Sequence, residues 1–434
     1  MRFKIIKMGI NGEGIAYKNG RPVFIEGALL EEEVEAKIYD EYKTYAKAKL
    51  IRVLEPSKER IDPPCPYFEK CGACSLMHLN YEKQKELKVE LLRESLFKYA
   101  RLNDVKINPL ISDDVKLGYR NSLKLPLTLF KGKLVSGLYQ YSSNHLMPIN
   151  KCLIHDTEIE RIRINVLNVL NKYHLPLYDP KTKKGMRALY IRRLGQKSEL
   201  CLISGKDEFE KELLKDLSKI EGLSSIYQSI NTSSGNTFFG KSFKHLALSS
   251  SLDFKFMGLK IKISLPSFFQ LNTHMAELLY TKVKELAGEG DILFEAYSGI
   301  GVMSLLLSKS YKKVLAVENI AQAIQNAKAI AKLNKIDNVE FMYDDAAMAL
   351  KKTAKKHKIS TLVLDPPRSG LDDNMLIGIT KALPDKIIYV SCNPATLAKN
   401  LSYLLKYYRL VEITPFDMFP ESAHVESISL LLRK

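Results

Sequence analysis

Two side chains capable of chemistry follow apolar runs near the carboxyl end of the sequence. Cys392 comes directly after IIYVS and is followed by Asn393 and Pro394, which end a strand, while Asp365 closes the run TLVLD before two prolines. The carboxyl ends of neighbouring parallel strands meet at one edge, where open α/β folds bind ligands. We therefore expect a thiol and a carboxylate to face one crevice, a pair suited to nucleophilic catalysis with an acid or base. A small core residue at 392 and a turn or capping residue at 365 are the alternatives.

The segment FEAYSGIGVMS predicts a nucleotide-binding loop between a strand and a helix. Gly299 and Gly301 lie where the chain must turn tightly, although the third glycine of a dinucleotide fingerprint is missing and a plain turn is the alternative. Glu318 ends the next strand, about 20 residues further on, the spacing at which an acidic residue binds ribose hydroxyls. Asp344 or Asp345, after the following strand, could accept a hydrogen bond from an adenine amino group or serve in a turn. Together these residues predict an adenosine-bearing cofactor.

Four of the six cysteines form a candidate metal site. Cys65, Cys71 and Cys74 lie within CPYFEKCGAC, and Cys152 in INKCLIH is the natural fourth ligand. Four thiolates suit a [4Fe–4S] cluster, but they also suit tetrahedral zinc, with His78 as a substitute ligand. The residues alone leave both possibilities open.

The elements that must position these side chains change character along the chain. Residues 1–57 contain five short strand patterns with turns at NGEG and at Asn19-Gly20, which predicts a small β-barrel. Residues 58–265 form a central α+β region, in which part of residues 79–115 is a candidate for packing against the last domain. From residue 266 to 434, strand and helix patterns alternate as in a doubly wound α/β sheet. The expected helices are residues 79–100, 157–172, 272–286, 302–309 and 321–333.

The charge predicts a polyanionic partner such as nucleic acid. The formal net charge is +17, and residues 101–200 carry 18 basic against 8 acidic side chains. Within them, GMRALYIRRLG could direct Arg187, Arg192 and Arg193 toward phosphates, although a solvated strand face is equally consistent. The sequence contains no apolar run of the roughly 20 residues that a membrane helix needs, and its start lacks the features of a signal peptide. We expect a cytoplasmic protein, monomeric, with no membrane or DNA partner.

At these motifs the sequence resembles the RNA uracil-5-methyltransferase family, whose members use S-adenosyl-L-methionine to make 5-methyluridine in ribosomal and transfer RNA. DPPRSG, SCNP and HVES occur in the family's order, and the resemblance spans nearly the whole chain. It implies that residues 1–57 form a TRAM domain, an OB-like barrel that binds RNA. It further implies that residues 266–434 form a Rossmann-like methyltransferase domain and that Cys65, Cys71, Cys74 and Cys152 hold a [4Fe–4S] cluster.

The resemblance also implies individual roles. Cys392 corresponds to the nucleophile that adds to uracil C6, Glu426 of HVES to the base that removes the C5 proton, and Asp365 to a catalytic contact of uracil or cofactor. Without the family, Glu426 would be only a surface carboxylate. The resemblance and the motifs described above together give the expected cofactor contacts. They are Gln270 of FFQLN, Tyr297, Gly299, Glu318, Asp345 and Asp365.

We therefore predict transfer of a methyl group from S-adenosylmethionine to C5 of a specific uridine through a Cys392–C6 adduct. The resemblance associates cluster-bearing members with 23S ribosomal RNA more than with transfer RNA, which is the first alternative. A non-catalytic RNA-binding or assembly factor is the second. Adenine amino-methylation gives no use to the SCNP thiol, and the incomplete glycine pattern disfavours a nicotinamide dehydrogenase. The chain departs from many relatives at Glu295 and Ser298, where those relatives have aspartate and cysteine.

Overall fold

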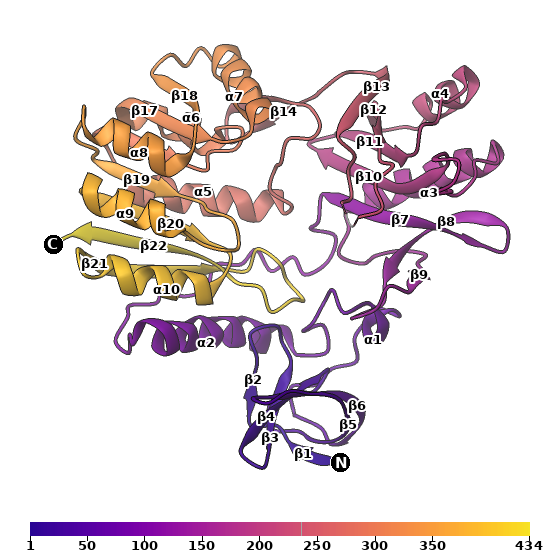
Figure 1. Ribbon diagram of the computed structural model, residues 1–434, viewed down its shortest axis with the longest axis horizontal. Helices are drawn as coiled ribbons and strands as arrows, with labels where there is room; N and C mark the ends of the chain where they lie inside the picture. Colours follow the sequence, from indigo (N-terminus) through magenta and orange to yellow (C-terminus); the bar gives the residue numbers. More distant parts are fainter. Residues whose placement is uncertain (236) are drawn as a thin grey trace.

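The structure is a computed structural model that describes residues 1–235 and 237–434 (Figure 1). A small β-domain at the amino end lies beneath the long helix α2, the central region lies to one side, and the carboxyl-terminal α/β domain lies above α2. Within the described residues, no helix combines the length and apolar character needed to cross a membrane.

The amino-terminal domain is a closed six-stranded sheet of order β1-β5-β6-β4-β3-β2. Its two outermost strands are consecutive parts of one extended segment, so the sheet closes on itself: the amide of Ile5 donates to Glu32 on one side, and that of Ile6 to Ile15 on the other. This break at Ile5 and Ile6 turns the first of the five predicted strands into two. The strands are β1 (Arg2–Lys4), β2 (Lys7–Met8), β3 (Gly14–Lys18), β4 (Arg21–Glu26), β5 (Glu33–Glu41) and β6 (Ala46–Glu55).

The helix α2 (Tyr81–Ala100) follows the short α1 (Phe68–Cys71) and packs against the carboxyl-terminal domain. Asn80 caps its first turn, and Leu92 and Leu96 enter that domain's hydrophobic core. Further along, Ile107 and Ile111 form parallel bridges to the last strands of the chain. Part of residues 79–115 thus packs with the carboxyl-terminal core, as predicted.

The central region is a seven-stranded sheet of order β13-β12-β11-β10-β7-β8-β9. The helices α3 and α4 cover one face, where their apolar side chains share a core with β7, β10 and β11. The bounds predicted for α3 match the structure. The elements are β7 (Ser122–Phe130), β8 (Lys133–Tyr139), β9 (Leu146–Pro148), α3 (Thr157–Lys172), β10 (Met186–Leu194), β11 (Lys197–Ser204), α4 (Lys211–Ser218), β12 (Leu223–Ile230) and β13 (Ser242–Leu248).

The three arginines of β10 do not form the phosphate-facing row considered from the sequence. Arg192 is only 2% exposed and forms a buried ion pair with Glu199. Both faces of the sheet are covered at this position, since the neighbouring Ile191 is buried as well. Arg193 pairs with Asp156 at 2.8 Å, and Arg187 donates to two backbone carbonyls. Their charge supports the fold, so the basic excess of this region is less available than the sequence suggested.

The carboxyl-terminal domain contains a seven-stranded sheet of order β18-β17-β16-β19-β20-β22-β21, preceded by the hairpin β14 (Leu252–Phe256) and β15 (Leu259–Ile263). The first five strands of this order are parallel, and β22 runs antiparallel to both neighbours. Helices α5, α6 and α7 cover one face, and α2, α8, α9 and α10 the other. This arrangement confirms the predicted Rossmann-like domain. The elements are α5 (Thr273–Ala287), β16 (Gly290–Ala296), α6 (Val302–Leu307), the 3-10 turn η1 (Ser308–Ser310), β17 (Tyr311–Glu318), α7 (Ala321–Leu333), β18 (Val339–Tyr343), α8 (Ala346–Ala354), β19 (Thr361–Leu364), α9 (Asp373–Ala382), β20 (Lys386–Ser391), α10 (Pro394–Leu404), β21 (Tyr408–Phe416) and β22 (Glu426–Arg433).

Removing the α2 side chain that enters this core tests the shared packing. Leu92 is fully buried, so we expect Leu92→Ala to lower the free energy of unfolding in urea by about 2–5 kcal/mol. The matched control is Phe97→Ala on the same helix, where the ring is 52% exposed and a change within about 0.5 kcal/mol is expected. Equal effects of the two substitutions would contradict the docking of α2.

Candidate active site

The predicted chemical residues meet at one edge of the carboxyl-terminal sheet. Asp365 directly follows β19 and Cys392 directly follows β20, at the carboxyl ends of neighbouring parallel strands. Because β22 is antiparallel, its first residue, Glu426, belongs to the same edge. Ser391 pairs with Ser427, so the next position in this register places Cys392 opposite Glu426. The sheet thus brings together a thiol and two carboxyls from three segments.

Burial changes the protonation of this group. It raises the pKa of Glu426 to about 8, with a further contribution from Asp365, and it raises the pKa of Asp365 to about 7. Burial and then the two carboxylates raise the pKa of Cys392 to about 11, while the charge of Arg368 opposes this. The thiol is therefore protonated near neutral pH. The carboxyls are stronger proton acceptors than ordinary acidic residues, as general bases at neutral pH need to be.

Tyr280 of α5 lies among these carboxyls and was not singled out in the sequence. The residue is 9% exposed, and burial, followed by the charges of Asp365, Glu295 and Glu426, raises the pKa of its hydroxyl. Gln270, a predicted contact, lies near this hydroxyl and opposes the rise of its pKa. A tyrosine on an amphipathic helix gives no local signal that distinguishes it from a core aromatic.

The turn after Asp365 is attached to the helix that follows Cys392. The side chains of Asn393 and Thr396 donate hydrogen bonds of 3.2 and 3.3 Å to the carbonyl of Arg368. Asn393 also caps α10, accepting from the amide of Ala395 at 3.0 Å. The two motifs DPPRSG and SCNP therefore hold each other, and Cys392 lies immediately before a helix amino terminus, a setting that favours a thiolate.

Arg368 and His424 form a polar contact at the rim of the site. The guanidinium Nη2 lies 2.9 Å from Nδ1 of His424. Burial and then the charge of Arg368 lower the pKa of His424, so its neutral ring can accept this hydrogen bond. Both residues belong to motifs quoted from the sequence, DPPRSG and HVES, but their contact could not be predicted from them.

The glycine loop is held by the residue predicted to bind ribose. The carboxylate of Glu318 accepts from the amide of Gly299 at 3.0 Å and from the amides of Asn319 and Ile320 at 2.8 and 3.0 Å. Gly299 has φ +56 and faces open space, whereas a Cβ at Gly301 would lie 2.4 Å from the Phe341 ring. Glu318 thus orders the glycine loop, and as the last residue of β17 it lies at the carboxyl edge of the sheet, where the cofactor is predicted to bind.

The neighbouring positions show how the family departures are accommodated. Glu295 is buried and accepts a short hydrogen bond from the hydroxyl of Ser304, while burial raises its pKa to about 8. Ser298 Oγ is buried without a hydrogen-bond partner. Tyr297 adopts φ +64, and its half-buried ring packs against the domain core, which also raises its pKa to about 12.

Asp345 serves as a helix cap. Its carboxylate accepts from the amide of Met348 at 2.9 Å at the start of α8, and the residue is exposed. The turn role considered from the sequence is therefore present, at the same edge of the sheet as Glu318.

The four predicted cysteine ligands line one cavity. Cys65, Cys71, Cys74 and Cys152 surround it together with apolar side chains, and burial raises the pKa of each of the last three thiols. His78 does not line this cavity; its ring lies 4.9 Å from that of Phe68. Among the residues that the structure describes, no three His, Cys, Asp or Glu side chains converge closely enough to hold a single metal ion.

Comparisons with known proteins identify the family. The family tRNA (Uracil-5-)-methyltransferase matches residues 242–434, and the TRAM domain matches residues 2–51. An uncharacterized RNA methyltransferase of Clostridium tetani is 34% identical, covering 98% of this chain and 95% of its own, and one of Listeria innocua is 35% identical over 98% and 95%. The chain belongs to the RNA uracil-5-methyltransferase family. The predicted TRAM domain is confirmed with it.

The fold of this RNA methyltransferase also has a solved counterpart. The Pyrococcus abyssi tRNA (uracil-54, C5)-methyltransferase, solved with S-adenosyl-L-homocysteine, is 23% identical and covers 100% of both chains with a TM-score of 0.78. At 23% sequence identity, this similarity shows that the two proteins share a fold. The barrel, the central sheet and the methyltransferase domain thus occur in the same combination.

The raised pKa of Glu426 predicts a particular dependence of stability on pH. The folded protein holds this proton up to about pH 8, whereas the unfolded chain releases it near pH 4.5, so stability falls as the pH rises between these values. Glu426→Gln removes this titration. We expect the free energy of unfolding of the variant, relative to that of the native protein, to increase from pH 5 to pH 9 in urea titrations. A difference that stays constant would contradict the buried, protonated carboxyl.

Proposed function

We propose that this protein transfers a methyl group from S-adenosylmethionine to C5 of a specific uridine in 23S ribosomal RNA. The observation that carries the proposal is the register that sets Cys392 opposite Glu426 at the edge where β19 delivers Asp365. Uracil C5 is a poor nucleophile unless C6 is first attacked, so the reaction needs a thiol for C6 and a base for C5. Both are present on adjacent strands.

The chain's own residues account for the proton transfers. Cys392 forms a bond to C6 as its thiol proton passes to the carboxylate of Asp365, whose raised pKa suits it to accept this proton, and Glu426 stays available for the last step. Asp365 holds the uracil ring, and the C5 carbon, now an enolate carbon, accepts the methyl group. The carboxylate form of Glu426 then removes the C5 proton, the C5–C6 double bond reforms, and the C6–S bond breaks to release Cys392, whose sulfur takes back the proton held by Asp365.

The glycine loop and the carboxyl ends of β17 and β18 fit S-adenosylmethionine, which when bound would supply an electrophilic sulfonium methyl group. The glycine loop is open at Gly299, and the buried Ser298 Oγ lacks a protein partner. Ile320 and Tyr343, at the ends of β17 and β18, are 56% and 65% exposed and offer apolar surface to an adenine ring. With Gln270, Tyr297, Glu318, Asp345 and Asp365, these groups would bind and orient the cofactor.

The family resemblance favours a [4Fe–4S] cluster over zinc in the cysteine cavity. Four thiols line the cavity, and His78, the substitute zinc ligand, is not among the lining residues. The choice of 23S ribosomal RNA rests on this cluster, because the family resemblance associates cluster-bearing members with that substrate. A uridine in folded RNA must be unstacked, so the TRAM barrel and the central region would supply the binding surface that offsets this cost.

Methyl transfer tests the reaction and the substrate together. Labelled methyl from S-adenosylmethionine should appear as 5-methyluridine in unmodified 23S ribosomal RNA, and Cys392→Ala should abolish it, because no other thiol replaces the nucleophile. Nucleoside analysis of separately purified ribosomal and transfer RNA gives the readout. Label in transfer RNA alone would show that transfer RNA, and not 23S ribosomal RNA, is the substrate. RNA binding without any methyl transfer would favour the alternative of a non-catalytic assembly factor.

Metal analysis tests the cysteine site. Anaerobically purified protein should contain about four iron and four sulfide per chain and absorb visible light. Cys71→Ser should lose this absorbance, whereas Cys392→Ala, a cysteine outside the cavity, should retain it. Stoichiometric zinc without iron or sulfide would overturn the cluster.

A further inference from the structure

The loop that leads into Glu426 is polar but buried. It connects β21 to β22 over residues 417–425, and Asp417, Glu421 and Ser422 are 0%, 5% and 7% exposed. Glu421 adopts φ +67, a left-handed conformation that a residue with a side chain holds only when its surroundings enforce it. The loop also carries His424. Its conformation therefore depends on partners outside its own strands.

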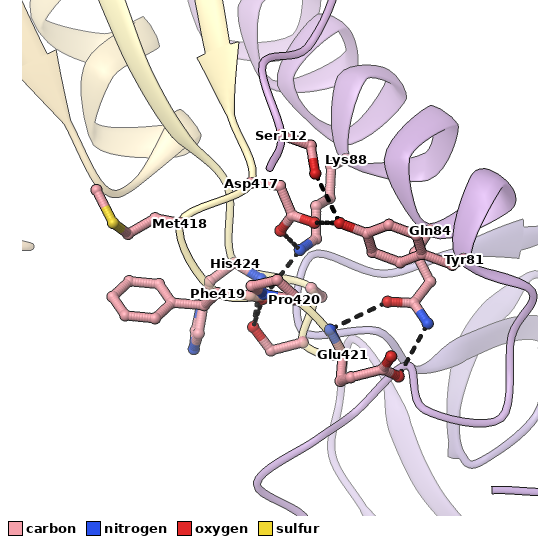
Figure 2. A network of polar contacts seen from close by, with 12 residues as sticks. Tyr81, Gln84, Lys88, Ser112, Asp417, Met418, Phe419, Pro420, Glu421 and His424 are labelled. Carbon is pink, nitrogen blue, oxygen red and sulfur yellow. Dashed lines mark hydrogen bonds and ion pairs between the residues drawn. The ribbon is translucent and has the colours of Figure 1, made fainter. Parts of the chain in front are cut away.

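One face of α2 supplies the main partners (Figure 2). The ammonium of Lys88 forms an ion pair with Asp417 in which both side chains are 0% exposed, and it donates to the carbonyl of Phe419 at 3.0 Å. The hydroxyl of Tyr81 donates to the other Asp417 oxygen at 2.8 Å. Positions 81 and 88 lie on the same side of a helix, two turns apart.

Gln84, between them, makes a reciprocal pair with the strained residue of the loop. Its Nε2 donates to the Glu421 carboxylate at 3.0 Å, and its Oε1 accepts from the Glu421 amide at 3.1 Å. This amide geometry uses both ends of the Gln84 side chain, so it fixes the backbone of Glu421 as well as its carboxylate.

The cysteine motif holds the same loop from another direction. The hydroxyl of Ser75, next to Cys74, accepts from the amide of Ala423 at 3.2 Å. The amide of Leu76 donates to the carbonyl of Glu421 at 2.9 Å. The segment from Cys74 to Lys88 thus contacts the loop at both of its ends.

A buried ion pair is a weak source of stability but a specific source of geometry. Removing Lys88 and Asp417 from water costs about as much as their attraction returns, but this loop conformation brings both Asp417 and the carbonyl of Phe419 to the Lys88 ammonium. The network therefore selects one conformation of the loop. Because the loop runs directly into β22, that conformation sets where the first residue of β22 lies.

We propose that Lys88 and Gln84 of α2, with Ser75 of the cysteine motif, are positioning residues for Glu426. The inference rests on the proposed function, in which Glu426 takes the C5 proton, the C5–H electrons form the C5–C6 double bond, and the C6–S bond breaks. A displaced Glu426 slows this last step more than the earlier ones. The methylated RNA then stays attached to Cys392.

The test uses the full-length protein and the RNA that the native enzyme methylates. We expect Lys88→Met and Gln84→Leu to lower kcat about 10- to 100-fold, as a misplacement of about 1 Å can do, with little change in KM for S-adenosylmethionine. Both variants should accumulate covalent protein–RNA complex on denaturing gels, as Glu426→Gln should. Glu421→Gln, which keeps an acceptor for Gln84, should remain near the native rate.

The control variant is Lys106→Ala, because its ammonium forms an exposed ion pair with Glu412 on β21 at 3.0 Å, away from the loop. If Lys88→Met does not fold, the milder Tyr81→Phe and Ser75→Ala decide, with smaller increases in trapped complex expected. Variants that lose stability but trap no more RNA than the native enzyme, while Glu426→Gln does trap it, would overturn the positioning role. Absence of 5-methyluridine with the native enzyme would instead overturn the proposed function and this inference with it.

Discussion

The antiparallel pairing of β22 with β20 is the constraint on which the site depends. Parallel strands bring only their carboxyl ends to the functional edge, so β19 and β20 deliver Asp365 and Cys392 there. A third group from a further parallel strand would come from the loop after it. The reversed direction of β22 instead delivers the residue at the beginning of the strand, and the register Ser391–Ser427 fixes it opposite the thiol.

This concentration of acidic groups opposes folding. Glu295, Asp365 and Glu426 lie around the buried hydroxyl of Tyr280, and burial raises the pKa of each carboxyl. Groups that hold a proton at neutral pH only because they are buried are typical of sites whose chemistry requires proton transfer. The apolar cores on both faces of the sheet offset this cost and keep the groups in place.

The strand ends could be predicted from the sequence because proline and asparagine stop strands visibly, as after Asp365 and Cys392. The helix over residues 321–333 was predicted with its observed bounds because its apolar spacing is regular. The polar contacts could not be predicted: a buried lysine such as Lys88 or a buried arginine such as Arg192 has the sequence signature of a surface residue. The packing of part of residues 79–115 against the last domain was predicted, but the individual side chains that make this contact were not.

The position of α2 has a consequence for biosynthesis. Lys88 meets Asp417 across a sequence separation of 329 residues, so the helix leaves the ribosome long before its partners exist. At elongation rates of about 5–20 residues per second, this interval is roughly 16 to 66 s. During that time the TRAM barrel and the central sheet can fold as units, and the barrel can cover Leu87 and Leu91, while Leu92 and Leu96 of α2 remain uncovered. The last strands of the chain therefore complete the enzyme, and a ribosome that stops early releases a chain with an exposed helix that chaperones and proteases can recognise.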